Sequence, residues 1–281
     1  MGRYFYFASG HSGTSCGKGV VGVGMGGGRE YYVDKNDKVV VFVLCHNDET
    51  LNIAGTNFAS YSWARPHRIP TTYIMESIFY TNLLPSLMDT IVTPETRWVG
   101  TLSWKAHEKT NMSIVNEMLT NSSLQKSEYD VMGFFVTDED KPMSYQIQRV
   151  HPGLMEAMEY ILLSVGETAE DIKCLYADPS VFKAFYANYM VVRPSWMRRY
   201  LKWIYRVIIF MNVDARAQKM IWADSKYNPA SIGGKHCSQD IYNRPYYPFH
   251  PFIGERLAPY FFHTRKANIL TIVEYFKSKK L

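Results

Sequence analysis

The sequence predicts an α/β protein with a mixed, mostly parallel sheet flanked by helices. The first observation is the continuous apolar run Val39–Cys45, whose β-branched residues are typical of a strand buried on both faces of a parallel sheet. The second is the abrupt polar end of this run at His46 and Asn47, followed by a helical pattern over residues 50–61. The third is that strand-like and helical segments continue to alternate along the chain.

The remaining elements are assigned from hydrophobic periodicity and from turn and capping residues. Strands are expected at residues 97–103, 129–136, 189–192 and 268–275, and helices at 72–88, 110–119, 152–165, 178–186, 194–211 and 255–263. Asp178 and Pro179 suit a helix start, because Asp is a good N-cap and Pro is tolerated in the first turn.

The chain divides into a glycine-rich N-terminal arm or loop, residues 1–38, and a single domain over residues 39–281. Nine of the 18 glycines fall between Gly10 and Gly28. A phosphate loop is disfavoured there, because Ser12 stands where the first glycine of that motif belongs and Gly19 replaces its Ser or Thr. In a doubly wound sheet, ligands instead bind beyond the carboxyl ends of the strands.

The formal net charge is +5, from 31 basic and 26 acidic residues. This mild excess suits an anionic ligand such as a nucleotide diphosphate, whereas a nucleic-acid-binding protein would carry a basic stripe. The four cysteines form no CxxC pair, so a reducing, cytoplasmic setting is expected. No run reaches the roughly 18 apolar residues of a transmembrane helix. The basic, aromatic helix over 194–211 either packs on the sheet or makes peripheral membrane contact.

Four blocks of sequence together resemble a known family. The blocks are Val41-Phe-Val-Leu-Cys-His-Asn-Asp48, Glu76-Ser-Ile-Phe-Tyr80, Trp98-Val-Gly-Thr-Leu-Ser-Trp-Lys105, and the pair Asn188-Tyr-Met-Val-Val-Arg193 and His250-Pro-Phe-Ile-Gly-Glu-Arg-Leu257. Their order and spacing are similar to those of small glycosyltransferases from capsular-polysaccharide clusters, which have a GT-A-like, Rossmann-like fold. The chain also resembles the capsid-glycan glycosyltransferases of chloroviruses. The resemblance covers roughly residues 39–275.

This resemblance implies an enzyme that transfers a sugar from a nucleotide-sugar donor to an oligosaccharide or glycoprotein acceptor. Within the viral group it implies an inverting xylosyltransferase that uses UDP-xylose and acts on a viral capsid glycan in the host cytoplasm. The sequence departs from the bacterial pattern at Ser103-Trp104-Lys105-Ala106, where that family has His-Tyr-Arg-Arg. Roles of the missing His and second Arg therefore do not carry over.

An inverting sugar transfer needs a carboxylate that deprotonates the acceptor hydroxyl. Glu255 is the first candidate, because it is expected to start a helix beside an aromatic-rich loop, and Glu76 is the second. Both also fit ordinary helix carboxylates. The leaving diphosphate needs a cation. Asp138 and Asp140 form an Asp-x-Asp motif after an apolar strand, which suits Mn²⁺ or Mg²⁺ but also suits a polar turn.

Several polar side chains are candidates for contacts with the nucleotide-sugar donor. They are His46, Asn47, Lys105, Asn188, Arg193 and Arg256. Lys and Arg among them would stabilise the diphosphate without a metal. Two other hypotheses stay open. One is a non-catalytic carbohydrate-binding or assembly protein that retains this fold, since fold does not imply activity. The other is a nucleotide- or nucleic-acid-handling enzyme, for which the glycine-rich arm and mild basicity are the only support.

Overall fold

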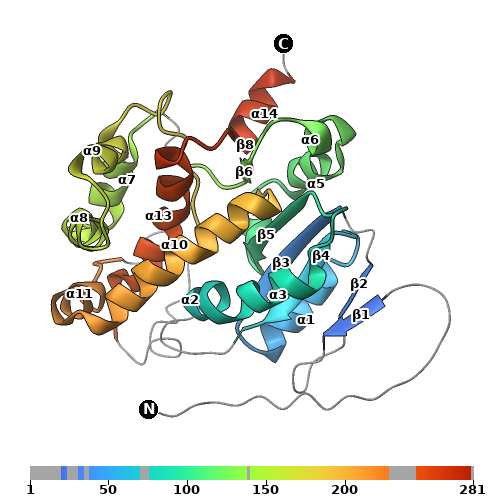
Figure 1. The fold of residues 1–281 in the computed structure, drawn as a ribbon, viewed down its shortest axis with the longest axis horizontal. Helices are drawn as coiled ribbons and strands as arrows, with labels where there is room; N and C mark the ends of the chain where they lie inside the picture. Colours follow the sequence, from blue (N-terminus) through green and yellow to red (C-terminus); the bar gives the residue numbers. More distant parts are fainter. Residues whose placement is uncertain are drawn as a thin grey trace.

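The computed structural model describes residues 20–23, 31–34, 38–69, 76–137, 140–227 and 245–279. Its main sheet has six strands in the order β4-β3-β5-β7-β6-β8 (Figure 1). The strands are β3 Val39–Cys45, β4 Ala64–Arg68, β5 Trp98–Ser103, β6 Val131–Gly133, β7 Met190–Val192 and β8 Ile269–Thr271. Strand β7 runs antiparallel to both neighbours, and the other pairs are parallel. The predicted mixed, mostly parallel α/β sheet is confirmed.

Helices cover both faces of this sheet. They are α1 Asp48–Asn57, α2 Glu76–Ile78, α3 Leu84–Ile91, α4 Ala106–Lys109, α5 Met112–Thr120, α6 Ser122–Lys126, α7 Met143–Val150, α8 Leu154–Ser164, α9 Ala169–Ile172, α10 Pro194–Val213, α11 Ala215–Ile221, α13 Phe249–Thr264 and α14 Ile272–Ser278. A π-helical turn, Phe79–Leu83, joins α2 to α3, and a 3-10 turn, Lys173–Tyr176, follows α9. None of the described helices is long and apolar enough to cross a membrane.

The alternation of side chains along β3 explains why the strand is apolar throughout. Val40, Phe42 and Leu44 belong to the core formed with α3, α8, α10 and α13. Val41 and Val43 belong to a second core, formed with α1, α5 and α14 on the opposite face. Because both faces are covered, each position along the strand is buried, as a doubly covered sheet requires.

Three of the differences between the structure and the sequence-based expectations have a local cause. Strand β4 was not predicted, because its sequence contains Pro66; β4 lies at the edge of the sheet, where a strand tolerates proline. The helix expected over 178–186 is wrong, because Asp178 caps a turn through the Ser180 amide, at 2.8 Å, and no helix follows. The last predicted strand ends at Thr271, whose capping box with Glu274 starts α14 instead.

A separate two-stranded sheet lies within the predicted N-terminal arm. Strands β1, Val20–Val23, and β2, Tyr31–Asp34, pair antiparallel, with Val20 opposite Asp34. The sheet is distinct from the main one. The rest of the predicted glycine-rich arm lies outside the described residues.

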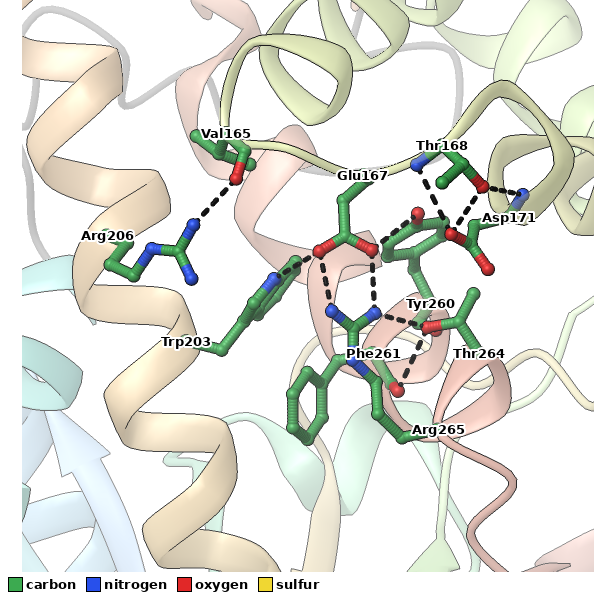
Figure 2. Close-up of polar contacts among 10 residues, drawn as sticks. All are labelled: Val165, Glu167, Thr168, Asp171, Trp203, Arg206, Tyr260, Phe261, Thr264 and Arg265. Atoms are coloured by element: carbon green, nitrogen blue, oxygen red, sulfur yellow. Dashed lines mark hydrogen bonds and ion pairs between the residues drawn. The ribbon is translucent and has the colours of Figure 1, made fainter.

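A buried cluster around Glu167 joins the loop after α8 to α10 and α13 (Figure 2). The side chain of Glu167, 6% exposed, accepts hydrogen bonds from Trp203 at 2.8 Å and Tyr260 at 3.0 Å. Both terminal nitrogens of Arg265 donate to it, at 2.7 and 2.6 Å. Burial by itself raises the pKa of Glu167, but these donors outweigh it and hold the pKa below the ordinary value.

Gly100 is where β5 packs closest to β7. A methyl group at this position would lie 1.9 Å from the carbonyl oxygen of Met190, which is backbone and cannot rotate away. We expect Gly100→Ala to lower the free energy of unfolding by about 1–3 kcal/mol or more, measured by urea denaturation. The matched control is Gly55→Ala in α1, where the methyl group meets nothing within 4 Å and should stabilise the helix slightly.

Candidate functional site

The candidate site lies at the carboxyl edge of the sheet, which is the side on which the parallel strands end. Strands β4 and β5 flank β3 on opposite sides, which makes the end of β3 a topological switch point, and His46 follows β3 directly. Because β7 is antiparallel, its first residue, Met190, pairs with Thr101 of β5 and Gly133 of β6 near their carboxyl ends. Asn188, just before β7, therefore reaches the same edge as His46.

A cavity of about 180 Å³ opens at this edge between α2, α10 and α13. The polar residues of its lining, called here the polar wall, are His46, Glu76, Ser77, Asn188, His250 and Glu255. Its aromatic and aliphatic lining residues, called here the apolar wall, include Tyr80, Tyr200, Ile204, Ile208, Met211 and Leu257. The structure thus brings together four residues that the sequence analysis proposed separately: His46, Glu76, Asn188 and Glu255.

The position of Glu76 depends on the π-helical turn that follows α2. The turn buries Tyr80, whose hydroxyl lies 2.6 Å from Oγ1 of Thr101. Because the Thr101 hydroxyl donates to the backbone oxygen of Asn188, at 2.7 Å, the Tyr80 hydroxyl must be the donor to Thr101. This chain of hydrogen bonds fixes the helix that carries Glu76 against the sheet edge and against Asn188.

Asn188 adopts an uncommon backbone conformation. Its φ is 55° and that of Ala187 is 59°, so two consecutive residues lie in the left-handed region. Asn tolerates this region better than most side chains, and such conformations cluster at binding sites. The side-chain amide donates to Oε2 of Glu76 at 3.2 Å, and its oxygen has no hydrogen-bond partner among the residues that the structure describes. The strained turn therefore aims a side chain at the carboxylate and at the cavity.

Glu76 and Glu255 form the acidic pair of the cavity. Burial raises the pKa of Glu76 to about 7, the hydrogen bond from Asn188 lowers it, and the negative charge of Glu255 raises it again. Lys109 makes a smaller, opposing contribution. Glu76 consequently exchanges a proton near neutral pH, which is the property of a general acid or base. The side chain of Glu255 is 28% exposed and lies 3.7 Å from Arg256.

Both histidines of the cavity are neutral at physiological pH. Burial, and secondarily the positive charge of Lys105, lowers the pKa of His46 to about 4. Burial lowers the pKa of His250 to about 4 as well. The ring of His250 stacks on Trp222, with centroids 5.4 Å apart and an interplanar angle of 3°, which fixes its orientation. Each ring therefore offers one donor and one acceptor nitrogen.

Two predicted donor contacts lie just outside the cavity. The Asn47 side chain caps α1 by accepting from the Thr50 amide at 2.8 Å, so its local role is structural. Lys105 precedes α4, and its Nζ lies 4.9 Å from the centre of the Trp104 ring. Lys105 is close enough to His46 to lower the pKa of that histidine, which places its charge near the rim of the cavity.

The two predicted arginines do not line the cavity. Arg193 follows β7 and lies on the side of the sheet where the parallel strands begin. Its guanidinium donates to the backbone oxygens of Gln125, Ser127 and Tyr129. The guanidinium also lies 4.0 Å from the centre of the Trp98 ring. Arg256, 1% exposed, donates to the Phe252 oxygen and to Gln146, both at 2.6 Å. In the described part of the chain, these contacts account for both side chains as structural groups.

The predicted metal motif is described only in part. Asp140 is exposed, pairs with Lys141 at 3.2 Å and does not line the cavity, while Asp138 lies outside the described residues. Among residues 38–69, 76–137, 140–227 and 245–279, no three His, Cys, Asp or Glu side chains are grouped to hold a metal ion. The Asp138–Asp140 metal site stays a prediction.

Sequence reasoning did not place the apolar wall in the site. The helix over 194–211 was predicted, but the spacing of Ile204, Ile208 and Met211 is that of any core-facing helix stripe. Tyr80 likewise belongs to the sequence block that begins at Glu76, but no role was predicted for it. Their contribution to a cavity depends on how α10 and α13 cross, which no local sequence signal reports.

The fold and the cavity together define an α/β protein with a ligand-sized, partly acidic cavity at the switch point of its sheet. Comparisons of the chain with protein-family models, curated proteins and solved structures found no match.

Proposed function

We propose that the protein is a glycosyltransferase in which Glu76 is the general base. The observation that carries this proposal is a partly buried carboxylate whose pKa is about 7, in a cavity lined by both polar and apolar side chains. Such a cavity suits a sugar, whose ring carries hydroxyl groups at its edge and C–H groups on its faces. A base whose pKa lies near the working pH is the most effective for proton transfer.

The proposed reaction is an inverting displacement at the anomeric carbon of the donor sugar. Glu76 accepts the proton of an acceptor hydroxyl, and the resulting oxygen forms a bond to the anomeric carbon of the donor sugar. The bond between that carbon and the phosphate oxygen breaks, and the nucleoside diphosphate leaves with the electron pair. Lys105, at the rim, is the described cation placed to meet the developing negative charge.

We propose the reverse order of the two candidate bases, with Glu76 first. Glu255 lies in the second turn of α13 and not at its start, because that helix begins at Phe249. Its effect on Glu76 is electrostatic: a second negative charge keeps the first carboxylate from ionising at low pH. We assign to Glu255 the tuning of Glu76 and contact with sugar hydroxyls, and to Glu76 the transfer of the proton.

The identity of the donor rests on the sequence resemblance. UDP-xylose is the first donor to test, and an oligosaccharide such as a viral capsid glycan is the matching acceptor class. The alternative is a carbohydrate-binding or assembly protein without catalysis, which the same cavity would serve. A sugar nucleotide that binds without turnover would favour that alternative.

A ligand screen tests the proposal directly. We expect one nucleotide, UDP first, to raise the melting temperature by several degrees at a concentration of 100 Kd, because binding there adds about 2.7 kcal/mol to the free energy of unfolding. The screen compares UDP, GDP, CMP and their common sugar conjugates, each with Mn²⁺ and with EDTA. Nucleotide release from the stabilising conjugate is then measured with and without pooled acceptor sugars. A flat response to every nucleotide would contradict the proposal.

A further inference from the structure

Two buried side chains at the cavity each carry a polar atom that has no hydrogen-bond partner among the described residues. Asn188 is 5% exposed and His250 is 3% exposed, and both line the cavity. The unpaired atoms are Oδ1 of Asn188 and Nε2 of His250. Because buried polar atoms in native structures are nearly always hydrogen-bonded, two unpaired ones at one cavity point to hydrogen bonds with a ligand.

The roles of these two atoms follow from their other contacts. The amide nitrogen of Asn188 is committed to Glu76 at 3.2 Å, so the side-chain oxygen is left as an acceptor. Burial keeps the His250 ring neutral, and the stack on Trp222 holds it in place, so Nε2 acts as either a donor or an acceptor according to the tautomer. A ligand hydroxyl, which donates and accepts, satisfies both.

The charge of the cavity selects against an anionic group. Its acidic side chains are those of Glu76 and Glu255, and no Lys or Arg is among the described residues that line it. A phosphate placed there would meet two acidic side chains in a partly desolvated site, which is unfavourable. The positive charge of Lys105 lies outside the cavity, at the rim beside His46.

The size and the apolar wall limit the neutral group that fits. A volume of about 180 Å³ holds roughly 12–18 water-sized groups, at about 10–15 Å³ each, which is enough for a single pyranose ring. Ile204, Ile208 and Leu257 supply aliphatic groups for the C–H faces of such a ring. The polar lining residues supply hydrogen-bond partners for its hydroxyl groups.

We infer that Asn188 and His250 are ligand-binding residues that hold the hydroxyl groups of one neutral sugar ring in this cavity, while the diphosphate of the donor stays outside it. The inference rests on the proposed function for the identity of the ligand as a sugar. His250 thereby acquires a role in binding. The neutral sugar ring lies in the cavity, and the charged diphosphate lies at the rim.

His250→Phe is the variant that tests this inference. Phenylalanine keeps an aromatic ring against Trp222 and removes both nitrogens. We expect the affinity for neutral methyl pyranosides, measured by saturation-transfer NMR on a defined mixture of methyl pentosides and hexosides, to fall at least tenfold. The affinity for UDP should change less than twofold. His250→Gln, which restores a hydrogen-bonding group, should recover part of the sugar affinity, a result that loss of packing alone would not produce.

A second variant keeps the test independent of how His250→Phe folds. Asn188→Gly removes the side-chain oxygen and suits the left-handed backbone, and it should weaken methyl pyranoside binding in the same way. Pyrophosphate should not compete with the pyranosides in the wild-type protein. Wild-type protein that binds no pyranoside, equal pyranoside binding in both folded variants, or competition by pyrophosphate would each overturn the inference.

The same measurements separate this inference from the proposed function. Pyranoside binding that depends on His250, without release of nucleotide from any sugar conjugate, would leave the inference standing and remove the glycosyltransferase proposal. Nucleotide release with an acceptor KM unchanged in His250→Phe would do the reverse.

Discussion

Replacing Glu76 with glutamine is expected to lower kcat for sugar transfer by about 10²–10⁴-fold, because the variant retains the shape of the side chain but cannot accept a proton. The affinity for the nucleotide donor should change little. The measurement is nucleotide release with the donor and acceptor that the ligand screen identifies. Glu255→Gln is the matched control, since it removes the other carboxylate of the cavity and leaves the proposed base in place.

The pH dependence of both variants sharpens this test. In the wild-type protein, kcat/KM should rise with pH through an apparent pKa of about 7, because the base acts in its ionised form. Glu255→Gln should move this rise to lower pH, because it removes a charge that raises the pKa of Glu76. Full activity in Glu76→Gln, combined with its loss in Glu255→Gln, would reverse the two assignments.

Glu76→Gln should also stabilise the fold at alkaline pH. The pKa of Glu76 is raised from 4.5 in the unfolded chain to about 7 in the folded one, so the folded state binds more protons between these values. Its free energy of unfolding therefore falls as pH rises through this window, by up to about 3 kcal/mol. Glu76→Gln lacks this loss and should be more stable than wild type at pH 8, but not at pH 4, by urea denaturation.

Truncation of Glu167 to alanine is expected to lower the free energy of unfolding by about 3–5 kcal/mol. The variant leaves the Arg265 guanidinium and the Trp203 nitrogen without the carboxylate that both contact (Figure 2). Urea denaturation measures the loss. Because hydrogen bonds hold the pKa of Glu167 below 4.5, the stabilisation by this group is present at neutral pH and is lost as the pH falls through that lowered pKa.

An exposed ion pair provides the comparison for this variant. Lys173 and Glu170 lie 2.6 Å apart, but both side chains are more than two-thirds exposed, so Lys173→Ala should cost less than about 1 kcal/mol. A double-mutant cycle between Glu167 and Arg265 isolates their coupling energy. A loss below 1 kcal/mol in Glu167→Ala would show that the buried cluster contributes no more than a surface pair.

The cluster around Glu167 also bears on the cavity. Trp203 belongs to α10 and Tyr260 to α13, and these two helices supply the apolar wall through Ile204 and Leu257. A carboxylate that hydrogen-bonds both helices therefore holds the two sides of that wall together. This explains how a structural group remote in sequence from Glu76 contributes to the shape of the site.

The reach of sequence reasoning is clearest in the sheet. Val39–Cys45 was predicted as a buried strand because a continuous apolar run of this length, rich in β-branched residues, favours a strand covered on both faces. Strand β4 was not predicted, because Pro66 and two arginines are unusual in a buried strand. A strand with this sequence is tolerated because β4 is the outermost strand of the sheet. The segment after Thr271 was mistaken for strand, because Ile272 and Val273 favour β structure and the capping box decides otherwise.

The amino-acid sequence by itself determined the α/β class, the strand that ends at His46 and the set of carboxylates available for chemistry. The tertiary structure alone decided which of these groups meet. Glu76 and Asn188 are 112 residues apart, and they bond because β7 runs antiparallel and therefore begins, just after Asn188, at the carboxyl edge. Burial at that meeting point, which no local sequence encodes, raises the pKa of Glu76 to about 7 and separates it from Glu255 as the proposed base.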